Sequence, residues 1–169
     1  MGPRRLQNSL PCDLILRPFA KGDGAASFDV FIDAVRNGTK EHYTAEQRAA
    51  WAPVDIMPAT WEDRHLATTA FVAESERQLE GFMTLTAEGV IDMAFVRPSA
   101  MGTGIAVQLY EKIEAAAHAS GMTRLSTQAS HLARPFFLRR GWNLLAAQTV
   151  QKRGQTLENF RMEKHLGSS

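Results

Sequence analysis

The chain has 169 residues, of which 44% are hydrophobic and 22% are charged, and its formal net charge at pH 7 is +1. This length fits one domain spanning residues 1–169, and the apolar fraction is too high for an intrinsically disordered protein. The small net charge gives no reason to expect a nucleic-acid partner, and the longest apolar runs are too short to predict a membrane span.

The cysteine content indicates a reducing compartment. Cys12 is the only cysteine, so it has no partner for an internal disulfide. We therefore expect a cytoplasmic protein in which Cys12 is a buried strand residue, with flexible ends at about residues 1–11 and 167–169.

The first part of the chain predicts a strand followed by an amphipathic helix. The strand runs from about Cys12 to Arg17 and ends at Pro18, and Asp23 is a candidate cap for the helix. Gly38 is a stop signal for the helix. Its apolar face is made by residues at helical spacing: Phe28, Phe31, Ile32 and Val35.

Two short helices should follow. Thr44 and Gln47 have the spacing of a capping box, and Thr60 can begin the second helix. Aromatic residues on such helices either pack on a sheet or line the rim of a cleft. Packing is the better interpretation for Trp61. For His42, Tyr43 and Trp51 the two interpretations are nearly balanced, so these three residues are candidates for acceptor binding.

The rest of the chain predicts strands with two intervening helices. The predicted strands are residues 69–74, 79–86, 90–96, 124–128, 142–151 and 156–166, and the predicted helices are residues 105–120 and 130–140. The strand at 90–96 is joined to the strand at 124–128 through a helix, so these two should be parallel.

A glycine turn lies between the strand at 90–96 and the helix at 105–120. Glycines there allow a ligand to approach the backbone, and the free N–H groups at a helix start attract phosphate. A Rossmann fingerprint would need a third glycine at Val107, and the P-loop residues are absent. Taken alone, the turn could equally be a strand-to-helix connection without a ligand.

The residues of this turn resemble a motif of a known family. Met101-Gly-Thr-Gly-Ile-Ala resembles the Gln/Arg-x-x-Gly-x-Gly/Ala turn with which GNAT-superfamily N-acetyltransferases hold the pyrophosphate of acetyl-coenzyme A. Residues 130–142 resemble the second signature of the family. Further segments resemble a bacterial subgroup called YafP-like: Tyr43-Thr-Ala-Glu-Gln, Trp51-Ala-Pro, Ile91-Asp-Met, Ala133-Arg-Pro-Phe-Phe and Asn159-Phe-Arg-Met-Glu-Lys.

The resemblance implies an α/β (α+β) fold with a mixed, mostly antiparallel sheet of about seven strands flanked by helices. Its central parallel strand pair is splayed in that family. It also implies acetyl-coenzyme A as co-substrate, with the thioester arm between the two splayed strands. The residues expected to bind it are Ala94, Phe95, Val96, Met101, Gly102, Thr103, Gly104, Ile105, Ala106, Ser130, Ala133, Phe136, Phe137 and Arg139.

Three departures from the family pattern affect side chains. Met101 and Thr103 replace residues that are often Gln or Arg, which leaves the backbone N–H groups to bind phosphate. Phe137 stands where many members have a tyrosine regarded as the general acid. Tyr43 is therefore our candidate for that role, with solvent as the other proton source.

Asp92 is the candidate base. Strict alternation along the strand would put it on one face with Ala94 and Val96, close to the thioester. An ion pair with a basic neighbour such as Arg134 is an equally good explanation of this carboxylate.

The implied function is N-acetyl transfer to a primary amine of a small molecule or peptide, by direct attack in a ternary complex. The alternatives are a coenzyme-binding sensor module with little catalysis, and a transferase for a longer acyl group or another acceptor. No metal is expected, because none of the five histidines is spaced as part of a helical metal site. Neither nucleic acid nor membrane is an expected partner, and a homodimer is left open.

Overall fold

The computed structural model describes residues 14–53 and 56–167. The expectations for Cys12 and for the chain ends at 1–11 and 168–169 therefore lie outside the described residues. Within the described part, no helix is both long and apolar enough to cross a membrane.

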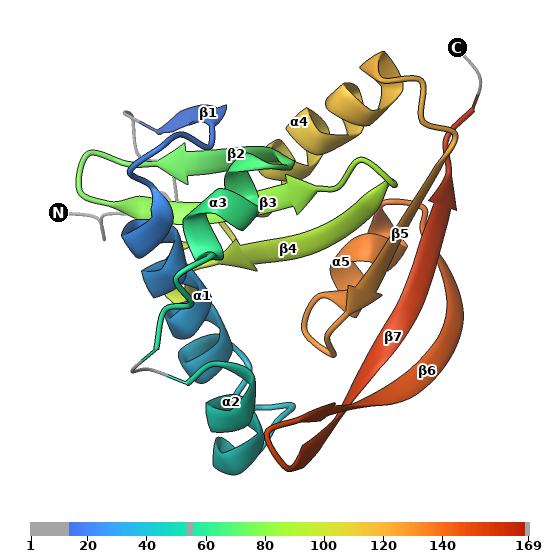
Figure 1. The fold of residues 1–169 in the computed structure, drawn as a ribbon. Helices are drawn as coiled ribbons and strands as arrows, with labels where there is room; N and C mark the ends of the chain where they lie inside the picture. The colour runs from blue at the N-terminus through green and yellow to red at the C-terminus, as the bar shows by residue number, and fades with distance from the viewer. Residues whose placement is uncertain (1–13, 54–55, 168–169) are drawn as a thin grey trace, which may run out of the picture.

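The described residues form a seven-stranded mixed sheet in the order β1-β2-β3-β4-β5-β7-β6, as Figure 1 shows. β4 and β5 are parallel, and the other neighbouring strands are antiparallel. This confirms the predicted fold class and the predicted parallel pair. The strands are β1 (Ile15–Pro18), β2 (Thr69–Glu74), β3 (Leu79–Leu85), β4 (Val90–Val96), β5 (Arg124–Ala129), β6 (Asn143–Lys152) and β7 (Gln155–His165).

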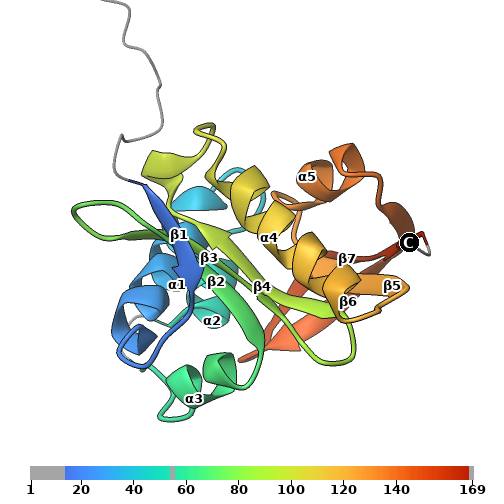
Figure 2. The same ribbon diagram turned by 90° about the horizontal axis from the view of Figure 1, so that it is seen from above.

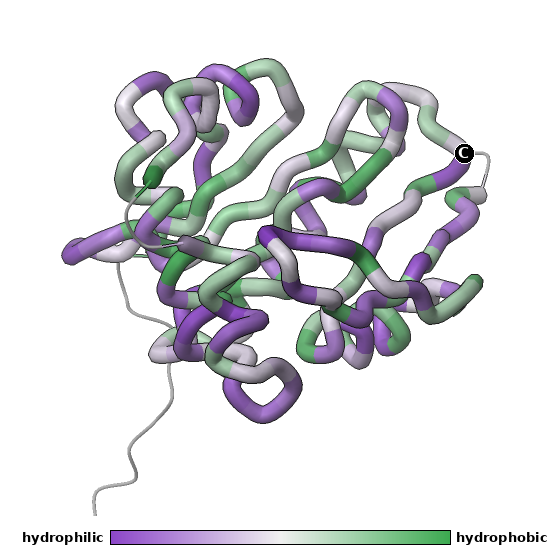
Figure 3. Tube along the Cα trace, turned by 60° about the horizontal axis from the view of Figure 1, so that its bottom comes forward, coloured by the Kyte–Doolittle hydropathy of each residue, from purple (hydrophilic) through white to green (hydrophobic). Residues whose placement is uncertain are grey.

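Helices cover both faces of the sheet, with α4 and α5 on one face and α1 and α3 on the other (Figure 2). Figure 3 shows hydrophobic residues along the central strands and hydrophilic residues in many of the outer loops. The sheet therefore separates two apolar cores. The helices are α1 (Gly24–Gly38), α2 (Ala45–Trp51), α3 (Trp61–Leu66), the 3₁₀ turn η1 (Pro98–Ala100), α4 (Ile105–Ala119) and α5 (Arg134–Arg139).

Each core follows from the spacing of apolar residues. Ile105, Leu109 and Ile113 recur every four residues on α4 and are at most 1% exposed, because this stripe faces the sheet. On the other face Trp61 is 4% exposed, its ring meets Phe28 edge-on at 5.2 Å, and its Nε1 donates to Ser27 Oγ. The packing interpretation of Trp61 is thus confirmed.

Local signals at the helix ends were correct in some cases and wrong in others. Thr44 begins α2 with both hydrogen bonds of the predicted capping box. Asp23 gives α1 no side-chain cap, because its carboxylate accepts hydrogen bonds from Arg17 at 2.7 and 2.9 Å instead. α5 begins at Arg134 rather than Ser130, whose Oγ accepts from the Ala133 amide within a turn.

The gap between β4 and β5 positions the candidate site. The two strands pair only where Val90 lies beside Ser126 and Ile91 beside Thr127. Beyond these residues they diverge (Figure 1), while β4 stays paired with β3 and β5 with β7. The facing edges of β4 and β5 thus bound an opening in the middle of the sheet.

Candidate active site

The glycine turn between β4 and α4 presents free backbone amides to a surface hollow. Gly102 and Gly104 have φ of +78° and +88°, a conformation that favours glycine, and a Cβ atom at either would meet nothing within 4 Å. Gln108 donates the first α4 hydrogen bond, to the Gly104 carbonyl. The amides of residues 105–107 therefore have no helical acceptor, and the positive end of the helix dipole lies beside them. This arrangement suits a phosphate group.

The amides of Met101 and Thr103 are used within the turn itself. The Met101 amide donates to Pro98 and the Thr103 amide to Ala100, and the Thr103 hydroxyl also donates to the Ala100 carbonyl. Neither amide is therefore free for a ligand. Residues 102 and 104–107 are left as the available donors.

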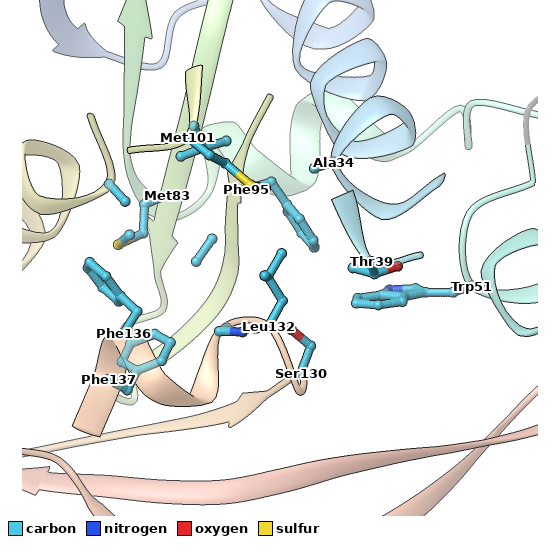
Figure 4. A pocket seen from close by; sticks show the side chains of 14 residues that line it. Ala34, Thr39, Trp51, Met83, Phe95, Met101, Ser130, Leu132, Phe136 and Phe137 are labelled. Carbon is cyan, nitrogen blue, oxygen red and sulfur yellow. Dashed lines mark hydrogen bonds between the residues drawn. The ribbon is translucent and has the colours of Figure 1, made fainter. Parts of the chain in front are cut away.

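A second, apolar cavity of about 200 Å³ lies next to this hollow at the gap between the strands. Figure 4 shows Met101 and Phe95 on one side of it, Phe136 and Phe137 on another, and Trp51 and Thr39 at the far end. It shares Val96, Met101, Ala106 and Phe136 with the hollow at the glycine turn. Its apolar lining suits an arm with an apolar end group.

All residues expected to bind the coenzyme line the hollow or this central cavity, except Thr103. The hollow is lined by Val96, Ala100, Met101, Gly102, Gly104, Ile105, Ala106, Val107, Phe136 and Arg139. The central cavity is lined by Ala34, Thr39, Trp51, Met83, Ala94, Phe95, Val96, Met101, Ala106, Ser130, Leu132, Ala133, Phe136 and Phe137.

A third cavity, of about 220 Å³, lies between α2 and the β6–β7 hairpin. It shares Trp51 and Ser130 with the central cavity, so the two adjoin. Several of its lining side chains are polar. The lining is Tyr43, Trp51, Gln128, Ser130, Val150, Gln151, Lys152, Leu157, Glu158 and Asn159.

Tyr43 contributes its ring to this third cavity, while its hydroxyl group is committed to the backbone. The hydroxyl donates to the Glu158 carbonyl at 2.6 Å and accepts from the His131 amide at 3.1 Å. Burial raises the pKa of the Tyr43 phenol. Trp51 packs edge-on against Tyr43, whereas His42 lines none of these cavities and its ring stacks on His131.

The expected position of Asp92 is wrong, because a β-bulge interrupts the alternation of β4. Thr84 lies opposite Met93, but Leu85 lies opposite Ile91, which leaves Asp92 as the extra residue. Ile91 therefore packs in the α4-side core with Ala94 and Val96.

The bulge turns Asp92 toward α3 on the opposite face of the sheet. Its carboxylate accepts from Arg64 at 2.5 Å. Arg134, the partner considered from the sequence, lies over the Phe160 ring at 4.5 Å. Asp92 lines none of the three cavities, but it directly follows the last β4 residue paired with β5 and lies on the Trp51 side of the sheet.

Some residues of the site could not be found from the sequence. Lys152 and Asn159 line the third cavity, and the only signal for them was their place in the predicted final hairpin. Leu132 enters the central cavity from the loop before α5. Among the described residues, no three His, Cys, Asp or Glu side chains cluster as a metal site.

Comparisons with known proteins agree with this fold. A family model described as an acetyltransferase (GNAT) domain matches residues 39–166, more than half of the chain. The chain is 31% identical over 147 residues to the uncharacterized N-acetyltransferase YafP of Escherichia coli K12, covering 87% of this chain and 93% of the relative.

Solved structures of acetyltransferases share this fold. A GCN5-related N-acetyltransferase from Rhodopseudomonas palustris superposes with a TM-score of 0.86 at 29% identity, over 93% of this chain and 98% of the other. The fold also resembles that of YncA from Salmonella typhimurium, solved with its cofactor acetyl-CoA, with a TM-score of 0.64 at 18% identity over 92% and 95% of the two chains. The chain therefore belongs to the GNAT acetyltransferase family and is an acyltransferase.

Proposed function

We propose that this protein transfers the acetyl group of acetyl-coenzyme A to a primary amine. The observation that carries the proposal is that three spaces adjoin one another in a row. They are the hollow at the glycine turn, the apolar cavity in the sheet and the polar cavity beyond it. These match, in order, a pyrophosphate, a thioester arm and a polar acceptor. YncA of Salmonella typhimurium, which has this fold, was solved with acetyl-CoA and supports the choice of donor.

The donor would bind along the first two spaces. Its pyrophosphate would accept hydrogen bonds from the free amides of Gly102 and residues 104–107. The amides of Met93 and Arg97 donate toward β3, so alternation directs those of Ala94 and Val96 into the gap. These two backbone positions can hold the pantetheine arm as an added strand would be held.

The reaction would be a direct attack of the amine on the thioester carbonyl. The C–N bond forms, the C–S bond breaks, and the coenzyme thiolate leaves. A gap-facing N–H group, such as that of Ala94, can stabilise the tetrahedral oxyanion, a contribution of about 3 kcal/mol per donor. Backbone atoms supply this stabilisation, so no nucleophilic side chain is required.

Two protons must move during the reaction. An alkylammonium group with a pKa near ~10 must first lose a proton. We assign its uptake to Asp92, through a water molecule, because this carboxylate directly follows the last β4 residue paired with β5, although it lines none of the three cavities and is paired with Arg64. The leaving thiolate, whose parent thiol has a pKa near ~8.5, can be protonated by solvent. If solvent does not protonate the thiolate, the Tyr43 hydroxyl would be the side chain that donates the proton.

Release of free coenzyme A thiol with a panel of amines tests this function, together with mass spectrometry of the acceptor. Acetylated amine in proportion to thiol is the expected result. Coenzyme binding without any acetylated product would favour a sensor module. Faster turnover with butyryl- than with acetyl-coenzyme A would point to a longer acyl donor. The cytoplasmic location remains a prediction, and a homodimer is left open.

A further inference from the structure

Hydrogen bonds between segments distant in sequence hold α2 beside the hairpin around the third cavity. Tyr43 Oη donates to the Glu158 carbonyl, Gln47 Nε2 to the Thr156 carbonyl, and Arg153 Nη1 to the Ala50 carbonyl. All three acceptors are main-chain oxygens. The cavity is thus a formed space between α2 and the hairpin, open toward the thioester cavity at Trp51 and Ser130.

Lys152 brings a positive charge to this cavity, and Glu158, the carboxylate residue in its lining, is paired with His131 instead. Lys152 makes no ion pair among the described residues. The strand register places Lys152 opposite Gln155 and Val150 opposite Leu157, so Lys152 lies on the sheet face that the cavity occupies. Strand alternation turns the Glu158 side chain away from that of Lys152, and its carboxylate accepts from His131 Nε2 at 2.9 Å.

Asn159 provides a hydrogen-bond acceptor nearer to the thioester cavity. Its Oδ1 is buried and has no hydrogen-bond partner among the described residues. An unpaired buried acceptor is costly, and an N–H group of a bound amine would satisfy it. Ser130 lies at the junction with the central cavity, so an amine held at this end is close to the acyl group.

The spacing of these two groups limits the acceptor. Asn159 lies opposite Gln148, and Lys152 is four residues further along β6, which corresponds to about 13 Å between backbone positions. Both side chains extend into the cavity and shorten the span that a ligand must bridge. An α-amino acid has its amine and carboxylate on one carbon and is too short to reach both groups.

We propose that the acceptor is a small amine of about dipeptide size whose carboxylate binds Lys152 while its amine lies at Asn159. This inference rests on the proposed function and adds the charge and the length of the acceptor. Because Lys152 is exposed at the end of an edge strand, its replacement should leave the fold intact.

The test compares dipeptides that have a free carboxylate with the same dipeptides as C-terminal amides, using acetyl-coenzyme A as donor. We expect the wild-type protein to favour the free acids by about two- to fivefold in kcat/KM, the effect expected of one exposed charge pair. Lys152→Gln should remove this preference through KM, and Lys152→Glu should reverse it. Lys112→Gln, an exposed change on α4, is the matched control and should keep the preference.

Four results would overturn the proposal. Equal kcat/KM for acids and amides in the wild-type protein is the first, and an unchanged preference in Lys152→Gln is the second, since the lysine would then only protect the strand edge. The third is loss of preference in Arg161→Gln but not in Lys152→Gln, because Arg161 lies outside the cavity lining. The fourth is acetylation of uncharged monoamines but of no dipeptide, which leaves the proposed function standing. Failure to bind coenzyme would instead remove the proposed function, and this inference with it.

Discussion

Gly104→Val should weaken coenzyme binding strongly without unfolding the protein. Gly104 has a φ of +88°, and a side chain in this left-handed region costs about 1–2 kcal/mol of folding free energy. For a chain of this length that cost lowers the Tm by about 2–8 °C. The new side chain would stand in the open space before the free amides of α4. Loss of two hydrogen bonds to a charged phosphate, at about 1.5 kcal/mol each, raises the Kd of coenzyme A about 100-fold.

Gly121→Val is the matched control at the other end of α4. Gly121 has a φ of +75° and also has open space around a Cβ position, so its backbone strain should be similar. Calorimetric titration with coenzyme A should show wild-type affinity for this variant and a large loss for Gly104→Val, with similar decreases in Tm. Wild-type affinity in Gly104→Val, or an equal loss in Gly121→Val, would refute the assignment of the phosphate site.

Four further variants test the roles of single ionisable groups and of the position that lacks one. Asp92→Asn should lower kcat about 100-fold while leaving the coenzyme Kd unchanged, and an unaltered pH–rate profile would exclude Asp92 as the base. Phe137→Tyr should keep or raise activity, whereas Tyr43→Phe should lower the free energy of unfolding by about 2 kcal/mol, because it leaves the Glu158 carbonyl and the His131 amide unpaired. Full activity of Tyr43→Phe would assign thiolate protonation to solvent. The hydrogen bonds from Arg17 lower the pKa of the Asp23 carboxyl, so this pair stabilises the fold above pH ~4 and loses its effect as the pH falls through the lowered pKa. In urea unfolding, the free energy of unfolding of Asp23→Asn should be about 1–2 kcal/mol below that of the wild-type protein at pH 6, and the two should be equal near pH 2. A difference that does not change with pH would contradict the lowered pKa of Asp23.

The sequence predicted the elements whose signals are local. The strand at Val90–Val96 is flanked by turn residues and Pro98, and α4 begins after two glycines, so both were placed correctly. The capping box at Thr44 was also correct, because all its atoms lie within four residues. The residues that the resemblance implied for coenzyme binding, except Thr103, do line the hollow or the central cavity, since the motif spans the same turn.

The errors arose where a partner distant in sequence or a change of register decides the structure. The β4 bulge depends on pairing with β3, so alternation alone could not predict on which face of the sheet the Asp92 side chain lies. Asp23 is held by Arg17 across a turn rather than capping α1. The Tyr43 hydroxyl bonds a carbonyl 115 residues away, and the cavity at Lys152 exists only because such contacts join α2 to the hairpin.

The most direct test of the central claim is a crystal structure of the protein with coenzyme A. We expect the pyrophosphate within hydrogen-bond distance of the amides of Gly102 and residues 104–107, and the pantetheine arm between β4 and β5. The thiol should lie in the cavity lined by Ala94, Phe137 and Ser130, facing the space beneath α2. Coenzyme bound anywhere else on the protein, or a gap between β4 and β5 that stays empty at saturating coenzyme, would contradict the account.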